Sequence, residues 1–363
     1  MSTRTVEYGV FLPVSSGGWI PSTTTPTLDG SYAYNLAVTR LAERLGFDFT
    51  LSQAVWRGYA GPSHHFEVNL ESLTTTAGLA ASTERIGVWS TCNTATFHPA
   101  VLAKMIATAD QISGGRTGLN IVAGGNRASE AQMGLGASLS NPDKYRRARE
   151  WVTVCKLLWT EDDVDFDGEF FTLKDCQSKP KPAAGPPPMI CAAVSDVGLR
   201  FTAEMLDGCL FEGTSRQSMI EVGTRAKRIA EEVGSPLKTY CVFMIIPGET
   251  DADAQRRLDL YNAGRDTETM ARMFAEHGDA AWDKAEFEAR RAVWEKATAV
   301  STGTLCGSTE TIAEQLADII EAGQIDGAVF IMPDFIGDLT ALGEGILPQL
   351  ARHGLTSAAL ALD

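Results

Sequence analysis

The feature that most constrains the fold of this 363-residue chain is a regular alternation of short apolar runs with helical patterns. Continuous apolar strands are typical of a parallel sheet that is covered on both faces. The runs that we interpret as strands are Val6–Val14, Phe47–Leu51, Ile86–Thr91, Gly118–Ala123, Met189–Val194, Cys209–Phe211, Tyr240–Ile246 and Ala328–Met332. About eight strands, each followed by a helix, is the count of a (β/α)8 TIM barrel. We therefore predict an α/β barrel, with a doubly wound open sheet as the structural alternative.

Three segments interrupt the alternation, and we interpret them as insertions in one barrel domain that spans residues 1–363. Gly17–Gly30 is rich in Ser, Thr, Gly and Pro, and it is expected to form a long loop after the first strand. Asp162–Leu173 has the pattern of a hairpin that turns at Asp167-Gly168. The polar, helical stretch Gly264–Gly303 is interpreted as a lid or as a contact between subunits.

Charge and composition exclude several classes of function. The formal net charge is −15, which disfavours nucleic acid, whose binding relies on Lys and Arg contacts to phosphate. No apolar run reaches the roughly 18 residues of a membrane span, and the amino terminus has no signal-peptide pattern. The seven cysteines are scattered and never spaced Cys-x-x-Cys. We expect free thiols in a reducing cytoplasm.

The common motifs of metal, nucleophilic and dinucleotide sites are missing from the sequence. None of the five histidines has the spacing of a zinc site. His64 and His65 are adjacent, and we expect them to be surface or supporting residues. There is no Gly-x-Ser-x-Gly elbow. Gly134-Leu135-Gly136 begins like a dinucleotide-binding loop, but Leu139 stands where the third glycine belongs.

Polar residues at the ends of the predicted strands remain as the candidates for a site. In a β/α barrel these ends form the active-site face. Asn120 is the most informative, because an amide inside an apolar strand must find partners or incur a burial cost. It is interpreted either as a tie between two strands or as a ligand-binding amide in the barrel mouth. The other candidates at strand ends are Thr91, Asn93, Ser195, Asp196 and Asp334.

The run from Lys144 to Arg149 opens a predicted helix after a loop. Basic residues at such a place can meet a phosphate, together with the unpaired N–H groups of the first turn. A solvated charged face is the alternative interpretation.

At this point the chain resembles a known family, the bacterial-luciferase-like flavin monooxygenases, and within it the pyrimidine monooxygenases of uracil degradation. The resemblance runs from about Tyr8 to Leu350. Its densest pieces are GVFLPVSSGGWI at 9–20, FDFTLSQAVWRGY at 47–59, NLESLTTTAGLAA at 69–81, DQISGGRTGLNIVAGG at 110–125, DFDGEFFTLKDC at 165–176, ICAAVSDVGLRF at 190–201 and GTLCGSTETIAEQL at 303–316.

The resemblance implies a luciferase-like TIM barrel that binds FMN without a covalent bond. The flavin contacts that it implies are Ala54, Val55, Asn120, Ser129 (or Glu130 if the loop aligns differently), Lys144, Tyr145 and Ser195. An oxygen pocket beside the flavin would use Thr91 and Asn120. These implied roles agree with the reasoning from strand ends and charge above, which singled out Asn120, Ser195 and the basic residues from Lys144 onward without the family.

The chain also departs from the pyrimidine monooxygenases at positions around the substrate. A basic residue is expected where Val55 stands, and Trp-Gln where Gly125-Asn126 stand. An aromatic residue of the pocket aligns near Leu210, beside Phe211. These departures leave uracil itself in doubt and make a pyridine a candidate.

The implied activity is a two-component monooxygenase that takes reduced FMN from a separate NAD(P)H-flavin reductase and uses O2. Through a flavin peroxide it would oxygenate and open an N-heteroaromatic ring such as a pyrimidine or pyridine. The alternatives are an oxygenase of sulfonates, sulfones or aminopolycarboxylates, a deazaflavin-dependent hydride-transfer enzyme, and a non-catalytic flavin-binding protein. The family favours homodimers or homotetramers.

Overall fold

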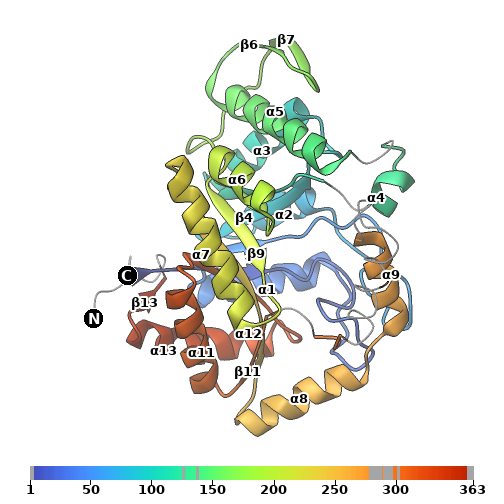
Figure 1. Cartoon of the computed structure of the whole chain (residues 1–363), viewed down its shortest axis with the longest axis vertical. Coiled ribbons are helices and arrows are strands. Elements are labelled where there is room, and N and C mark those ends of the chain that lie inside the picture. The colour runs from blue at the N-terminus through green and yellow to red at the C-terminus, as the bar shows by residue number, and fades with distance from the viewer. Residues whose placement is uncertain are drawn as a thin grey trace.

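A closed barrel of eight parallel strands forms the centre of the computed structural model, which describes residues 4–124, 127–135, 139–277, 288, 297–300 and 303–357 (Figure 1). Each strand pairs with the next, and the last pairs with the first through Val329 and Gly9. The ring is closed, so the open-sheet alternative is wrong. The barrel strands are β2 (Glu7–Phe11), β3 (Phe49–Leu51), β4 (Gly87–Asn93), β5 (Thr117–Val122), β8 (Met189–Ala192), β9 (Gly208–Glu212), β10 (Lys238–Pro247) and β12 (Gly327–Ile331).

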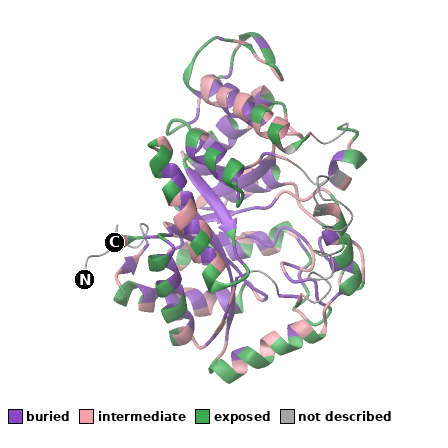
Figure 2. Cartoon of the chain, in the orientation of Figure 1, coloured by how far each residue is buried: buried purple, intermediate pink, exposed green. Residues whose placement is uncertain are grey.

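Helices cover the outside of the barrel and bury their apolar faces against it (Figure 2). All eight predicted strands are confirmed, with bounds that differ by a few residues, and helices follow them as the alternation predicts. The helices that follow the strands are α1 (Tyr32–Arg44), α2 (Ser72–Ala80), α3 (Pro99–Ser113), α5 (Asn141–Thr160), α6 (Asp196–Met205), α7 (Arg216–Val233), α8 (Asp251–Ala263), α11 (Thr309–Ala322), α12 (Gly337–Ala341), η1 (Leu342–Ile346) and α13 (Leu347–Arg352).

The floor of the barrel is filled by three aromatic rings. Phe49 and Trp89 stack with ring centroids 4.2 Å apart, and Tyr240 meets both rings near the perpendicular at 6.0 Å. Glycines on the neighbouring strands leave the space that these rings occupy. A Cβ added at Gly118 would lie 2.5 Å from the Trp89 ring, and one at Gly327 would overlap the Tyr240 ring. Because this space is packed, the interior is a core and not a channel.

Small elements complete the described structure. The predicted hairpin is present as β6 (Val164–Asp167) and β7 (Thr172–Cys176), which pair antiparallel and project beyond α5 (Figure 1). The other additions are β1 (Arg4–Thr5) paired with β13 (Leu355–Thr356), β11 (Thr304–Gly307) paired with β10, α4 (Arg127–Gln132) and α9 (Thr267–His277). Among the helices that the structure describes, none is long and apolar enough to cross a membrane.

The predicted insertion at 264–303 is described only in part. It begins with α9 as a helix, while residues 278–287, 289–296 and 301–302 lie outside the described structure. Asp266 fastens its start to two other loops: the backbone N–H of Asp266 donates to Pro21 O at 2.9 Å, and its carboxylate accepts from Ser63 N and Ser63 Oγ at 2.8 and 2.6 Å. This segment therefore lies against the loops that follow β2 and β3. Its role as a lid or a subunit contact stays a prediction.

Candidate functional site

Asn120 and Thr91 meet at the upper end of the barrel interior. They are register partners on the paired strands β5 and β4, and both face inward one step above Gly118 and Trp89. Asn120 Nδ2 donates to Thr91 Oγ1 at 3.2 Å, and both residues are buried. The other amide atom, Oδ1 of Asn120, is buried without a hydrogen-bond partner in the described part of the chain. Asn120 is thus both a tie between strands and an amide with an unused polar atom, which is costly unless a ligand satisfies it.

A network of hydroxyl groups fixes the backbone of Thr91. The Thr91 backbone N–H donates to Ser72 Oγ at 2.8 Å, and Ser72 Oγ lies 2.5 Å from Ser52 Oγ. Ser52 directly follows β3, and Ser72 begins α2, whose first N–H groups are capped by the Glu71 carboxylate. The three elements are therefore joined just outside the barrel wall, so the position of Thr91 is fixed by its backbone as well as by its strand.

The start of α5 brings a second group of predicted residues together. The helix begins at Asn141 after an N-cap at Ser140, so Lys144 lies in its second turn and not at its opening. The Tyr145 hydroxyl is hydrogen-bonded to Ser195, and burial raises the pKa of this phenol. Lys144 Nζ lies 5.4 Å from the centre of the Tyr145 ring. The Lys144 cation, the Tyr145 phenol and the Ser195 hydroxyl therefore lie close together, near the starts of α5 and α6.

Backbone geometry favours an anionic ligand at this place. Ser195 is the N-cap of α6 and accepts from Gly198 N at 3.3 Å. Gly198 is needed there, because a Cβ would lie 2.6 Å from the Tyr145 hydroxyl oxygen. A helix N-terminus with a lysine beside it is suited to a phosphate group. On the other side, Lys144 packs over Gly124 at the end of β5, the strand that carries Asn120.

The remaining predicted flavin contacts, Ala54, Val55 and Ser129, lie in the segments that follow β3 and β5. Ala54 and Val55 are half-buried in the loop that follows β3, and Ser129 is buried in α4 next to the equally buried Glu130. Gly125 and Asn126 lie outside the described residues.

Two further candidates lie on strands β9 and β4. Leu210 faces the barrel interior, whereas its neighbour Phe211 packs outward among the helices. Asn93 uses its side-chain oxygen to accept from Ala95 N at 2.8 Å, which is a local turn contact.

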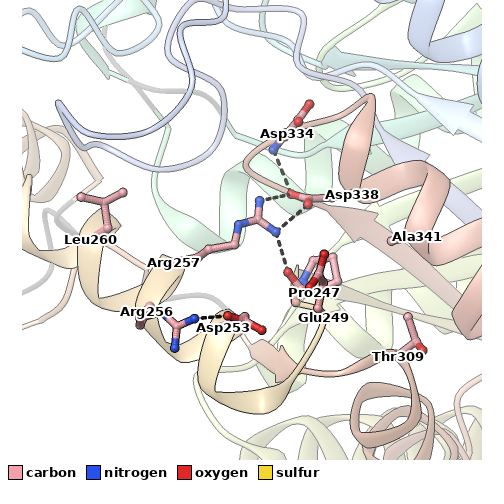
Figure 3. Close-up of a pocket in the computed structure, with 11 residues that line it drawn as sticks. Pro247, Glu249, Asp253, Arg256, Arg257, Leu260, Thr309, Asp334, Asp338 and Ala341 are labelled. Atoms are coloured by element: carbon pink, nitrogen blue, oxygen red, sulfur yellow. Dashed lines mark hydrogen bonds and ion pairs between the residues drawn. The ribbon is translucent and has the colours of Figure 1, made fainter.

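Asp334 lines a cavity whose lining residues do not include Asn120 (Figure 3). This cavity of about 820 Å³ lies between α8 and the ends of β10 and β12, and its lining includes none of the predicted flavin contacts. Arg257 points across it and donates to both carboxylate oxygens of Asp338, at 2.8 and 3.0 Å (Figure 3). Asp334 accepts from Ile336 N and Gly337 N at 3.1 and 3.2 Å. Its carboxylate thus holds the start of α12 in place.

The two adjacent histidines have different environments. His64 is exposed, with its ring nitrogen 2.5 Å from the Glu67 carboxylate. His65 is buried, and its Nδ1 has no hydrogen-bond partner among the described residues. The surface option is confirmed for His64, whereas His65 is buried, so only the supporting role remains open for it. Sequence reasoning did not single out His65 as a candidate. No local pattern marks it, because its burial comes from loops that are far apart in the sequence.

Metal and thiol chemistry find no support in the described structure. No group of three His, Cys, Asp or Glu side chains is arranged to hold a metal ion in the ranges described above. The seven cysteines are free thiols, and burial raises the pKa of Cys92, Cys191 and Cys209. Such thiols are poor nucleophiles.

Comparison with known proteins decides the family. The model of the luciferase-like monooxygenase family matches residues 6–325. The chain belongs to this family. It is 36% identical over 354 residues to the pyrimidine monooxygenase RutA of Yersinia enterocolitica, covering 95% of each chain. It is also 36% identical to RutA of Caulobacter segnis, covering 95% of this chain and 99% of that one. The predicted family is confirmed, and this luciferase-like protein is a flavin-dependent monooxygenase.

Solved structures show the same fold at lower identity. A riboflavin lyase with modified FMN and riboflavin superposes with a TM-score of 0.87 at 18% identity, covering 98% of this chain and 93% of that one. An EDTA monooxygenase from Chelativorans sp. BNC1 superposes with a TM-score of 0.80 at 21% identity, covering 97% and 94%. These likenesses confirm the predicted luciferase-like barrel.

Proposed function

We propose that this luciferase-like monooxygenase uses reduced FMN and O2 to oxygenate and open an N-heteroaromatic ring, such as a pyrimidine or a pyridine. The relatives named pyrimidine monooxygenase support this substrate class, since they match the chain over almost its full length. The observation that carries the proposal is the unpartnered Oδ1 of Asn120, held at the barrel mouth by Thr91.

The described residues fit FMN by the chemistry of their donors and acceptors. Lys144, Tyr145 and Ser195 would hold the phosphate, because they join a cation, a phenol and a helix N-terminus. Asn120 would present its free amide atom to the polar edge of the flavin ring. We assign contacts along the flavin to Ala54, Val55 and Ser129, on the alignment with the family.

The protein's own part in the reaction is to orient and to exclude water. When bound, reduced FMN supplies the activation of O2, and the cofactor carries the hard chemistry. Thr91 and Asn120 would hydrogen-bond the reacting oxygen atoms from fixed positions, since strand pairing and the Ser72 contact hold both side chains. Their burial keeps bulk water from these atoms.

A separate NAD(P)H-flavin reductase would supply the reduced FMN, as in a two-component system. We place the enzyme in the cytoplasm, which suits seven free cysteines, and as a homodimer or homotetramer. Light scattering after size exclusion measures the assembly directly.

Aerobic turnover with FMN, NADH and a generic flavin reductase tests the function. Uracil, thymine and pyridine would be supplied under ¹⁸O2, with products read by mass spectrometry. A ring-opened product that carries the label is the expected result. Simple reoxidation of the flavin with every ring would contradict the proposal. The same assay with a sulfonate, a sulfone and an aminopolycarboxylate then tests the other oxygenase classes.

A further inference from the structure

His65 is a buried histidine in the loop between β3 and α2, on the face of the barrel where the strands end. Its ring stacks on Phe66 with centroids 4.0 Å apart and an angle of 20° between the planes. The Tyr59 ring lies 6.3 Å away at 23°. Phe66 in turn meets Trp19 edge-on at 6.1 Å, and Trp19 lies against Phe11 of β2 at 4.4 Å. A continuous row of aromatic rings therefore leads from the end of β2 to His65; Phe11 and Trp19 are partly buried, and Phe66 and His65 are buried.

The backbone around His65 is held in an unusual conformation. Ala60, His64 and Phe66 all have positive φ angles, of 54°, 50° and 60°. This region disfavours residues with a side chain, and a bulky one such as Phe above all. Contacts to the loop after β2 hold the conformation: Phe66 N donates to Ser16 O, and Ser16 Oγ donates to His64 O, both at 2.9 Å. Strain of this kind concentrates at ligand-binding positions.

The unused nitrogen of His65 faces a place where the chain has no side chain. Gly17 lies beside this atom, and a Cβ on it would be in van der Waals contact with His65 Nδ1 at 3.5 Å. Nδ1 itself is buried and has no partner in the described part of the chain. The nearby carboxylate of Asp266 is occupied by Ser63 and Thr269. Burial lowers the pKa of His65 to about 4 against the attraction of Asp266, so the ring is neutral at pH 7.

We propose that His65 is a substrate-recognition residue that hydrogen-bonds, through Nδ1, a ring nitrogen or the adjacent amide group of an uncharged planar heterocycle. A neutral imidazole carries one donor and one acceptor, so it can hydrogen-bond either an N–H group or a bare ring nitrogen. Because it carries no charge, it pairs less well with a charged substrate. Trp19, which is only partly buried, is the ring of this row that suits contact with a flat ring. The inference rests on the proposed function and adds a residue to it.

The test compares His65→Phe with His65→Asn in the full-length protein loaded with oxidised FMN. Phe keeps an aromatic ring without nitrogens, whereas Asn keeps a polar atom near the position of Nδ1. His64→Asn is the matched control, because His64 is the exposed neighbour. Binding of uracil, thymine and pyridine is followed by the change in flavin absorbance, which needs no turnover. FMN affinity and melting temperature are measured on every variant.

We expect His65→Phe to weaken binding of the best ring at least tenfold and to raise KM similarly. His65→Asn should remain within about threefold of the original protein, and His64→Asn should match it. The FMN affinity of His65→Phe should be unchanged and its melting temperature equal or higher, because the variant removes an unpaired buried polar atom.

Unchanged ring binding in His65→Phe would overturn the inference alone. So would loss of FMN binding and a lower melting temperature in both His65→Phe and a second nitrogen-free variant, His65→Leu, since a structural role predicts that result. Absence of ring binding by the original protein would overturn the proposed function and this inference with it.

Discussion

Asn120 and Thr91 lie directly opposite each other on β5 and β4, and the Asn120 amide spends one of its two polar atoms on the Thr91 hydroxyl. The other amide atom, Oδ1, has no hydrogen-bond partner among the described residues. In the proposed function, this pair would join a structural contact to a binding group at one position. Mutations that separate the two roles are therefore the most direct probes of the site.

Replacing Asn120 by Ala should reduce product formation by about 100-fold or more, the usual effect of removing a preorganised hydrogen-bonding group. The fold should survive, because the strands remain paired through their backbones. Labelled-product yield and circular dichroism measure the two effects. Ser90→Ala is the control, since Ser90 lies on the neighbouring strand β4 and has a buried hydroxyl with no hydrogen-bond partner among the described residues. An Asn120→Ala protein with full yield would contradict the assignment.

Replacing Lys144 by Ala should weaken FMN binding by about tenfold, because a charge-assisted contact to phosphate is lost. Tyr145→Phe should weaken it less, since only the hydroxyl bound to Ser195 is removed. Quenching of FMN fluorescence measures both. Arg146→Ala serves as the control: this neighbouring cation is 55% exposed and pairs with Asp143 and Glu169. Equal losses in Lys144→Ala and Arg146→Ala would point to a general charge effect.

His65 should make the stability of the protein depend on pH in mildly acidic solution. Its pKa falls from 6.5 to about 4 on folding, because burial disfavours the charged ring. Between those values the unfolded chain binds a proton that the folded chain does not. Stability contributed by the neutral ring is therefore complete above pH 6.5 and is lost as pH falls toward 4, by on the order of 2–3 kcal/mol.

Urea unfolding at pH 7.5 and pH 5.0 measures this effect. The difference between the two free energies should be smaller in His65→Phe than in the original protein. Equal pH dependence in the two proteins would show that His65 is not the group responsible.

Replacing Arg257 by Met should destabilise the protein by about 2–4 kcal/mol, because it leaves the Asp338 carboxylate buried without its cation. The Asp338 side chain is only 5% exposed, and that of Arg257 is 30% exposed. Combining Arg257→Met with Asp338→Asn should recover part of the loss, as read by chemical denaturation. The exposed pair Arg228 and Glu232 gives the comparison, and its removal should cost less than about 1 kcal/mol. Strict additivity of the two substitutions would contradict this coupling.

Replacing Glu150 by Ala should release the β6–β7 hairpin from α5. Its carboxylate accepts from the backbone N–H groups of Glu169, Phe170 and Phe171 at 2.7, 2.8 and 3.2 Å. Loss of these contacts should speed hydrogen exchange at the three amides and proteolysis within residues 162–176, at a global cost of about 1–2 kcal/mol. Glu169→Ala, which keeps the carboxylate of Glu150, should leave the exchange rates close to normal.

The barrel strands were predictable because each is a continuous apolar run, but α8 and β11 were not. Helix α8 buries only Ala254 and Tyr261 completely, so it has almost no apolar face that sequence periodicity can detect. Strand β11 has four residues and joins the edge of β10 outside the ring. Short edge elements of this kind depend on pairing between distant residues, which no local pattern records.

Asn120 could be singled out from the sequence, whereas His65 could not. An amide in an apolar strand is unusual in its immediate sequence, whereas His65 lies in a polar loop among glycines and serines. Its burial is produced by the segments around Gly17 and Asp266, which are far from it in the chain. The roles of Ser129 and Val55 stay predictions from family alignment.

The rings of Phe49, Trp89 and Tyr240 have a kinetic consequence. Because they close one end of the barrel, every molecule that reaches Asn120 has to enter and leave by the other end. FMN, O2, substrate and product would then all enter and leave through this one opening. Such an enzyme should show a compulsory order of ligand binding and product release. The product should inhibit by competing with the ligand that binds next.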